Sequence, residues 1–238
     1  MPTSAFPLLL QPEADEPASL SERAYYRIRD LIVSLELAPG AVVSERELME
    51  RLGLGRTPIR EALRTLAQEK LVEVYPRRGI FVSPVDVGDL AALSEARIAL
   101  ECFAARLAAQ RATRADREVA RALLDELPRA ARVPDERALI DLDQRIHRHV
   151  YRCAHNPFIE STLNEYYILT LRIWFLALDR VARLDDAVTE HRELLQAICD
   201  GDPAQARGWY QRASQDGNAK ATERLKILAS LSGTGPSD

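Results

Sequence analysis

The chain has 238 residues, 47% of them hydrophobic, and a formal net charge of −4, so it can fill one large or two small cores. Its three cysteines, Cys102, Cys153 and Cys199, lie in apolar stretches without metal or redox spacing, which argues against a disulfide framework and predicts buried thiols in a reducing compartment. The apolar run at 168–178 is too short to span a bilayer and contains Arg172. We therefore expect a cytoplasmic protein without a membrane segment.

The composition divides the chain into two domains between two tails. We expect disordered tails at residues 1–17 and 232–238, which are rich in Pro, Ser, Gly or acidic residues. Residues 18–84 hold 11 Arg and Lys against 9 Asp and Glu, and the rest of the chain is acidic. A nucleic-acid partner would therefore be bound by a local basic patch on residues 18–84.

Residues 44–64 predict two short helices joined by a tight turn. Ser44 is a good N-cap for the first helix. Gly53 permits the sharp connection that follows this helix. We expect the second helix to begin with Thr57 as its cap and Pro58 at its first position. This arrangement predicts a helix-turn-helix.

Two arginines open the second of these helices. Arg56 and Arg60 are four residues apart, so they project from the same side of the first turns. Free backbone amides at a helix N-terminus favour phosphate, and a recognition helix presents its first side chains to base edges. Duplex DNA is therefore the expected partner.

The next segment predicts a basic β-hairpin. Leu71–Tyr75 and Ile80–Ser83 alternate like short strands, and the turn at 76–79 carries Arg77 and Arg78. Beside a recognition helix such a hairpin is a wing that reaches a neighbouring groove or phosphate row. The alternative is a solvated hairpin whose charge has no partner.

These motifs, from Pro39 to Val82, resemble the DNA-binding domain of GntR-type transcriptional regulators, notably in SEREL, RTPIREAL and PRRGIFV. The resemblance implies a winged helix-turn-helix over residues 18–84. Gly55 stands where relatives usually have serine or threonine, so one side-chain contact to phosphate is expected to be missing. The expected DNA contacts, with Arg77 added from the hairpin, are Arg46, Arg56, Thr57, Arg60, Arg77, Arg78 and Gly79.

Residues 85–231 show helical periodicity throughout and no strand pattern. The fold class is therefore mainly α, a winged helix-turn-helix followed by an antiparallel helical bundle. The interior of such a bundle is a usual place for a ligand or metal. We expect helices near 86–111, 113–128, 135–154, 157–181, 184–200 and 203–228.

Two arginines stand where apolar residues are expected in the bundle. Arg97 lies in the apolar stripe formed by Leu93, Leu100 and further residues, so it faces inward and needs an anion. Two hypotheses stay open for Arg97: an ion pair with Glu101 one turn later, or a clamp for a carboxylate effector. Arg172, within its apolar helix, is a second candidate for binding the effector.

Asp143 and His147 are four residues apart, on one helical face that can chelate a metal. His191 occupies an inward position on a later helix. His149, two residues after His147, points to another side and is not expected to be a ligand. The alternative for these inward histidines is hydrogen bonding within the core.

The bundle stretches EARIALECFAARLAA, DLDQRIHRHVYRCAHNPFI and EHRELLQAICDGDPAQA resemble the FCD effector domain of FadR-like GntR regulators. This resemblance implies dimerisation, a small carboxylate effector, and a divalent metal such as zinc or nickel held by one aspartate and three histidines. Asp143, His147 and His191 fall on three ligand positions. The fourth is Ala213, with Asp216 one turn later as a substitute. Either the metal is bound weakly or the chain belongs to a metal-free branch.

The resulting expectation is a homodimer that binds a palindromic operator and represses transcription until a small organic acid binds its bundle. Two alternatives remain open. One is a metal-dependent enzyme built on the three candidate ligands, for which we find no nucleophile motif and expect no catalytic residue. The other is a constitutive DNA-binding protein whose bundle only dimerises.

Overall fold

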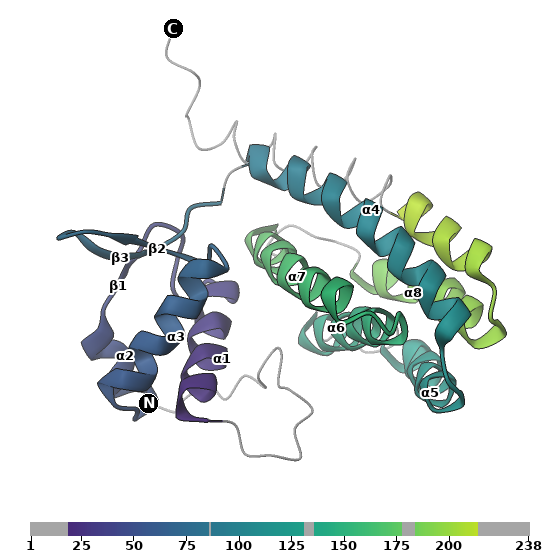
Figure 1. Ribbon diagram of the computed structural model, residues 1–238, viewed down its shortest axis with the longest axis horizontal. Helices are drawn as coiled ribbons and strands as arrows, with labels where there is room; N and C mark the ends of the chain where they lie inside the picture. Colours follow the sequence, from purple (N-terminus) through teal and green to yellow (C-terminus); the bar gives the residue numbers. More distant parts are fainter. Residues whose placement is uncertain (1–18, 86, 131–135, 178–183, 214–238) are drawn as a thin grey trace, which may run out of the picture. The chain divides into compact units, whose positions relative to one another are not determined.

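The computed structural model describes residues 19–85, 87–130, 136–177 and 184–213 (Figure 1). These residues form two compact units, 19–85 with 168–177, and 87–167 with 184–213. The tails predicted at 1–17 and 232–238, and Asp216, lie outside the described residues. Within the described ranges, no helix combines the length and the apolar character that crossing a membrane requires.

The first unit contains three helices and a small antiparallel sheet. Helix α1 lies beside α3, and the strands follow the order β1-β3-β2 (Figure 1). Buried side chains of α1 and α3, such as Ile28, Ile32, Leu63 and Leu66, form the centre of the unit. The elements are α1 (Leu20–Val33), β1 (Val42–Val43), α2 (Glu45–Leu52), α3 (Arg56–Gln68), β2 (Val72–Tyr75) and β3 (Gly79–Val82).

The helix-turn-helix forms as predicted, with one correction. The Ser44 hydroxyl accepts the Glu47 amide at 3.3 Å, and Gly53 ends α2 in the left-handed conformation at φ 64°. However, α3 begins at Arg56 with Gly55 as its N-cap, so the prediction of Thr57 as the cap was wrong. Gly55 already has the extended conformation of an N-cap, φ −72° and ψ 171°. Pro58 then falls within the first turn, where its missing N–H costs no intrahelical hydrogen bond.

The predicted hairpin is also present, and it carries a third strand. β2 and β3 pair in antiparallel register from Val72 opposite Val82 to Tyr75 opposite Gly79. The turn between them uses positive φ at Arg77, 63°, and at Gly79, 110°. β1 pairs with the other edge of β3. Its two residues are too few to show an alternating pattern, so the sequence did not reveal this strand.

The second unit is an all-helical bundle in which α6 packs against α4, α5 and α8. Its core includes Ile146 and Val150 of α6 and Leu194 and Leu195 of α8. The predicted helix positions are confirmed within the described ranges, although α7 groups with this unit only as far as Tyr167. The elements are α4 (Val87–Arg111), α5 (Arg114–Ala130), α6 (Glu136–Cys153), α7 (Pro157–Ala177) and α8 (Leu184–Asp200), followed by helical residues 203–213.

Candidate DNA-reading surface and metal centre

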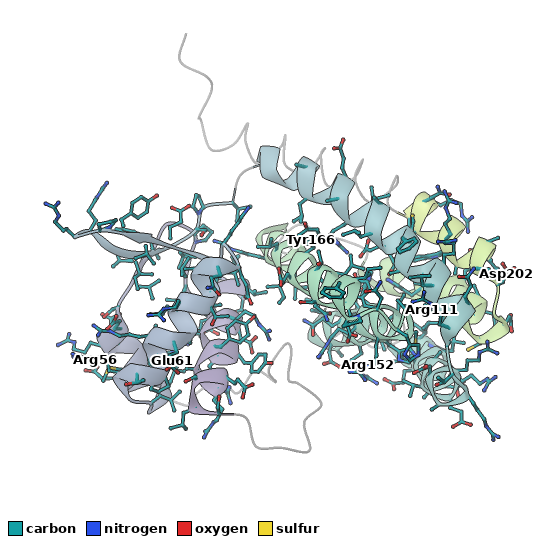
Figure 2. All side chains as sticks on the ribbon, in the orientation of Figure 1. Arg56, Glu61, Arg111, Arg152, Tyr166 and Asp202 are labelled. Carbon is teal, nitrogen blue, oxygen red and sulfur yellow. The ribbon has the colours of Figure 1, made fainter. Side chains whose placement is uncertain are left out.

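Three exposed arginines follow one face of α3. Arg56, Arg60 and Arg64 are spaced by four residues, and all three are exposed. Figure 2 labels Arg56, the first residue of the helix. Arg64 was missed at the sequence level, although its spacing from Arg60 contained the signal. A row of cations along a recognition helix suits phosphates near its N-terminus and base edges beyond it.

The N-terminus of α3 is open to an anion. The cap residue Gly55 contributes no side-chain hydrogen bond, and the first turn holds no acidic residue. The amides of that turn therefore keep their capacity to donate, and the helix dipole adds a partial positive charge. Thr57, which is exposed in this turn, offers a hydroxyl to the same anion. The position suits a DNA phosphate.

Arg46 and Arg60 each have an acidic neighbour, in different geometries. Arg46 lies on α2 with 83% of its side chain exposed, and its Nε is 3.9 Å from Glu50. Arg60 donates its Nε to both carboxylate oxygens of Glu45, at 3.0 and 2.9 Å. Arg46 is thus free to move toward DNA, whereas Arg60 is held in one orientation.

The tip of the hairpin places its cations in solvent. Arg77 and Arg78 are both exposed, and the Arg78 guanidinium lies 5.8 Å from the centre of the Tyr75 ring. That contact restricts Arg78 through a cation–π interaction, while Arg77 has no partner among the described residues. The two arginines can reach a phosphate row, as the wing hypothesis requires.

In the bundle, the structure brings the three predicted metal ligands together. The Nε2 atoms of His147 and His191 are 3.2 Å apart, although the residues are 44 positions apart in sequence. The Asp143 carboxylate lies 3.9 Å from His147 Nε2 and 3.6 Å from His191 Nε2. One potential ligand atom from each residue therefore falls within a single cluster. Both histidines are buried.

These separations fit one divalent cation. Two nitrogens bound to a tetrahedral zinc at about 2.0–2.1 Å lie roughly 3.3 Å apart, close to the 3.2 Å between the two histidines. Two imidazoles and a carboxylate also form a donor set that zinc and nickel accept. We conclude that the residues present are compatible with a metal. Ala213 follows on helical residues 203–213 and supplies no donor.

Phenol groups surround the other nitrogen of His147. The hydroxyls of Tyr151 and Tyr210 lie 3.2 and 3.1 Å from its Nδ1. Tyr151 donates its own proton to Glu101 at 2.5 Å, so its oxygen is left to accept. This arrangement favours a proton on Nδ1 and a lone pair on Nε2, the tautomer that a metal ligand needs.

Burial sets the protonation of His147 and of the phenols around it. It lowers the pKa of His147 to about 3, although the nearby Asp143 carboxylate opposes this shift. Burial likewise raises the pKa of Tyr151, Tyr167 and Tyr210. At neutral pH the imidazole of His147 is therefore neutral and able to coordinate, and the phenols stay protonated.

The other two ligands are also held in place. Tyr167 donates its hydroxyl to Asp143 at 2.6 Å, and the Trp209 ring lies 4.8 Å from the His191 ring between centres. The sequence did not reveal these supports, because Tyr167 and Trp209 come from separate helices. Tyr151 could have been identified, since it follows His147 by one helical turn.

Arg97 forms an ion pair with Glu101 and keeps one N–H that can donate a further hydrogen bond. Its Nη2 donates to Glu101 at 2.6 Å, so the ion-pair hypothesis is confirmed. Its Nε is buried and has no hydrogen-bond partner among the described residues. Burial lowers the pKa of Arg97, but Glu101 and Tyr151 together raise it above its ordinary value, so the guanidinium stays charged. The guanidinium also lies 5.8 Å from the Tyr167 ring, which joins it to the metal cluster through Asp143.

Arg172 and His149 have different surroundings. Arg172 is buried in the first unit, donates to the backbone carbonyl of Ser83, and has a pKa lowered to about 10 by burial. Its Nε, like that of Arg97, is buried without a hydrogen-bond partner among the described residues. However, Arg172 belongs to the first unit and the cluster of Asp143, His147 and His191 to the second, so we do not include Arg172 in the candidate site. His149 Nε2 lies 2.9 Å from the Asp116 carbonyl and outside the metal cluster, as expected.

Comparison with known protein families gives two matches. The model described as "Bacterial regulatory proteins, gntR family" matches residues 20–82, and the model described as "FCD domain" matches residues 92–213. Both ranges fall within the predicted domains, 18–84 and 85–231. The second model alone covers about half of the chain.

Curated relatives extend over most of the chain. An HTH-type transcriptional regulator from Streptomyces ambofaciens is 36% identical over 189 residues, 77% of either chain. A probable D-xylose utilization operon transcriptional repressor from Paenarthrobacter nicotinovorans is 34% identical over 74% of this chain and 79% of its own. The galactonate operon transcriptional repressor of Escherichia coli is 29% identical over 87% of this chain and 97% of its own.

Among solved structures, E. coli McbR/YncC has a TM-score of 0.77 at 22% identity, covering 88% of this chain and all of its own. A putative GntR regulator from Rhodococcus has a TM-score of 0.66 at 21% identity, covering 86% and 98%. At these identities the likeness concerns the fold alone.

Proposed function

Since the chain belongs to the GntR family of bacterial regulatory proteins and carries an FCD domain, we propose that it is a repressor released from its operator by a small organic acid. Family membership makes it a DNA-binding transcriptional regulator and not an enzyme, which decides against the metalloenzyme alternative. Two relatives that are named as repressors support repression as the sign of regulation.

The observation that carries the proposal is the exposed row Arg56, Arg60 and Arg64 at the open N-terminus of α3. A winged helix-turn-helix docks this helix in the major groove, where arginine reads guanine through two hydrogen bonds. Arg46 and the wing residues Arg77 and Arg78 add phosphate contacts. We infer that two copies of the chain bind a palindromic operator, because one recognition helix reads only one half-site.

For the effector, we propose the region between Arg97 and the cluster of Asp143, His147 and His191. The charged Arg97 guanidinium keeps one unpartnered N–H, which suits a carboxylate oxygen. A divalent zinc or nickel ion, held by the three ligands, would bind a further oxygen of the same molecule. The metal supplies a positive charge in a buried site, while Tyr151 and Tyr210 orient His147 for it.

The test begins with the DNA sequence. Selection from random duplexes should give a palindrome, and fluorescence anisotropy then measures its affinity for the purified protein. Sugar acids such as aldonates form the first effector panel, because two relatives are named for D-xylose and galactonate operons. We expect one acid to weaken operator binding at least about tenfold and to be recovered unchanged. An operator affinity that no acid in a broad panel of organic acids changes would favour the constitutive alternative.

A further inference from the structure

An ion pair links the two helices of the helix-turn-helix. Glu45 is the first residue of α2, and both of its carboxylate oxygens accept the Nε proton of Arg60 on α3, at 2.9 and 3.0 Å. The Glu45 side chain is 29% exposed and that of Arg60 is 59% exposed. By contrast, the contact between Arg46 and Glu50 within α2 is 3.9 Å long with both side chains at least 70% exposed. Glu45 is therefore a fixed neighbour of Arg60, and not one of several solvated acids.

The contact uses only one edge of the guanidinium. Arg60 donates through Nε, and within the described ranges its two Nη atoms have no hydrogen-bond partner. Those two nitrogens are the pair that can donate to O6 and N7 of guanine. A carboxylate bound at Nε also restricts a side chain with high rotamer entropy before DNA arrives. The geometry thus leaves the reading edge free while fixing its direction.

The charge of Glu45 has a second consequence. The carboxylate lies at the surface that would face DNA, where phosphates repel it. A complex with guanine at the correct position offsets this repulsion through the two hydrogen bonds from Arg60. A complex with another sequence keeps the repulsion and loses those bonds, so the same acid weakens non-specific binding.

We propose that Glu45 is a positioning residue for sequence reading, which holds Arg60 toward a guanine of each half-site and penalises binding to other sequences. The proposal rests on the DNA-binding function above. It predicts opposite changes in two quantities, since removing the charge should strengthen non-specific binding while discrimination at one base pair is lost. A pair that only stabilises the fold would produce neither change.

The test compares Glu45→Gln with Glu50→Gln, a control that removes the same charge from the same helix. Anisotropy measures affinity for the selected operator, for operators with single substitutions, and for an unrelated duplex. We expect Glu45→Gln to bind the unrelated duplex about three- to tenfold more tightly and to lose at least about fivefold discrimination at one position per half-site. Glu50→Gln should leave discrimination at that position unchanged.

Two further variants test whether Arg60 is the residue through which Glu45 acts, and whether the charge or the length of the Glu45 side chain matters. Arg60→Ala should lose discrimination at the same base pair, and adding Glu45→Gln to it should cause no further loss there. Glu45→Asp keeps the charge but shortens the side chain, so non-specific affinity should stay near wild type while discrimination falls. Unchanged discrimination in Glu45→Gln, or an equal loss of affinity for every duplex, would overturn the proposal. A wild-type protein that selects no sequence at all would instead refute the DNA-reading function.

Discussion

The DNA-reading surface and the bundle cluster use polar side chains under opposite physical conditions. Arg56, Arg60 and Arg64 are exposed on a single helix, where water solvates their charges and burial costs nothing. His147 and His191 are buried and come from two helices, and their hydrogen bonds hold them before any ligand arrives.

The difference determines what each region can do. We expect that the exposed arginines can be exchanged one at a time with modest loss, because each would contact a separate phosphate or base. The buried cluster acts as a unit, since Glu101, Tyr151 and His147 form one chain of hydrogen bonds. Changes in the cluster should therefore affect metal binding and stability together, whereas changes of the exposed arginines on α3 should mainly affect DNA binding.

The largest effect is expected on the recognition helix. The double variant Arg56→Ala, Arg60→Ala removes two cations from the reading face and should weaken operator binding at least about 30-fold, since each contact contributes about 1–3 kcal/mol. The matched control is Arg23→Ala with Arg27→Ala, which removes two exposed arginines from α1 of the same unit. Anisotropy gives the affinities, and circular dichroism checks the fold. Equal losses in both double variants would indicate a non-specific charge effect.

One substitution should raise the metal affinity of the cluster. Ala213 follows Trp209 by one helical turn, and Trp209 packs on the His191 ring, so both positions share a face toward the cluster. Ala213→His should therefore raise zinc or nickel affinity at least about tenfold, about 1.4 kcal/mol, by adding an imidazole. His147→Ala should lower the metal affinity below that of the wild type.

Chelator competition and elemental analysis measure both effects on the metal. Arg212→His is the control, because it adds the same imidazole one residue away on the exposed surface. An Ala213→His affinity no higher than that of Arg212→His would show that position 213 does not face the metal.

Acid should destabilise the folded bundle through His147. Its pKa is about 3 in the folded protein because of burial and about 6.5 in the unfolded chain, so the unfolded state binds an extra proton between these values. The contribution is fully present above about pH 6.5 and declines as the pH falls toward 3. In metal-free protein, the free energy of unfolding should therefore fall more steeply with acid in wild type than in His147→Gln. Denaturant titrations from pH 7.5 to 4.5 measure this free energy, and parallel pH dependences of wild type and His147→Gln would contradict the assignment.

The smallest effect is expected at the wing. Arg77→Ala should weaken binding to all duplexes alike and reduce the slope of log affinity against log salt by about 1, because it removes one phosphate contact. Discrimination among operator variants should not change. A loss confined to one base pair would instead place Arg77 in a groove.

The sequence predicted the helix-turn-helix more completely than the bundle cluster, because the first depends on local signals and the second on tertiary packing. The helix-turn-helix is local, so caps, glycines and arginine spacing within about 40 residues identified it, apart from the cap at Gly55 and the two-residue β1. Asp143 and His147 were visible as neighbours on one turn and His191 as an inward residue of its helix, and the family pattern grouped the three. Tyr167, Trp209 and Tyr210 could not be predicted, because tertiary packing alone brings these aromatic side chains to the histidines.

The central claim is that an acid bound near Arg97 controls DNA binding, and Arg97→Met tests it most directly. This variant keeps much of the bulk and removes the charge, and combining it with Glu101→Gln avoids an unpaired buried carboxylate. Operator affinity is measured by anisotropy with and without the acid that releases the wild type. We predict that Arg97→Met, Glu101→Gln binds the operator like wild type and needs at least about tenfold more acid for release, while Glu101→Gln alone still responds. A wild-type response to the acid in the double variant would contradict the account.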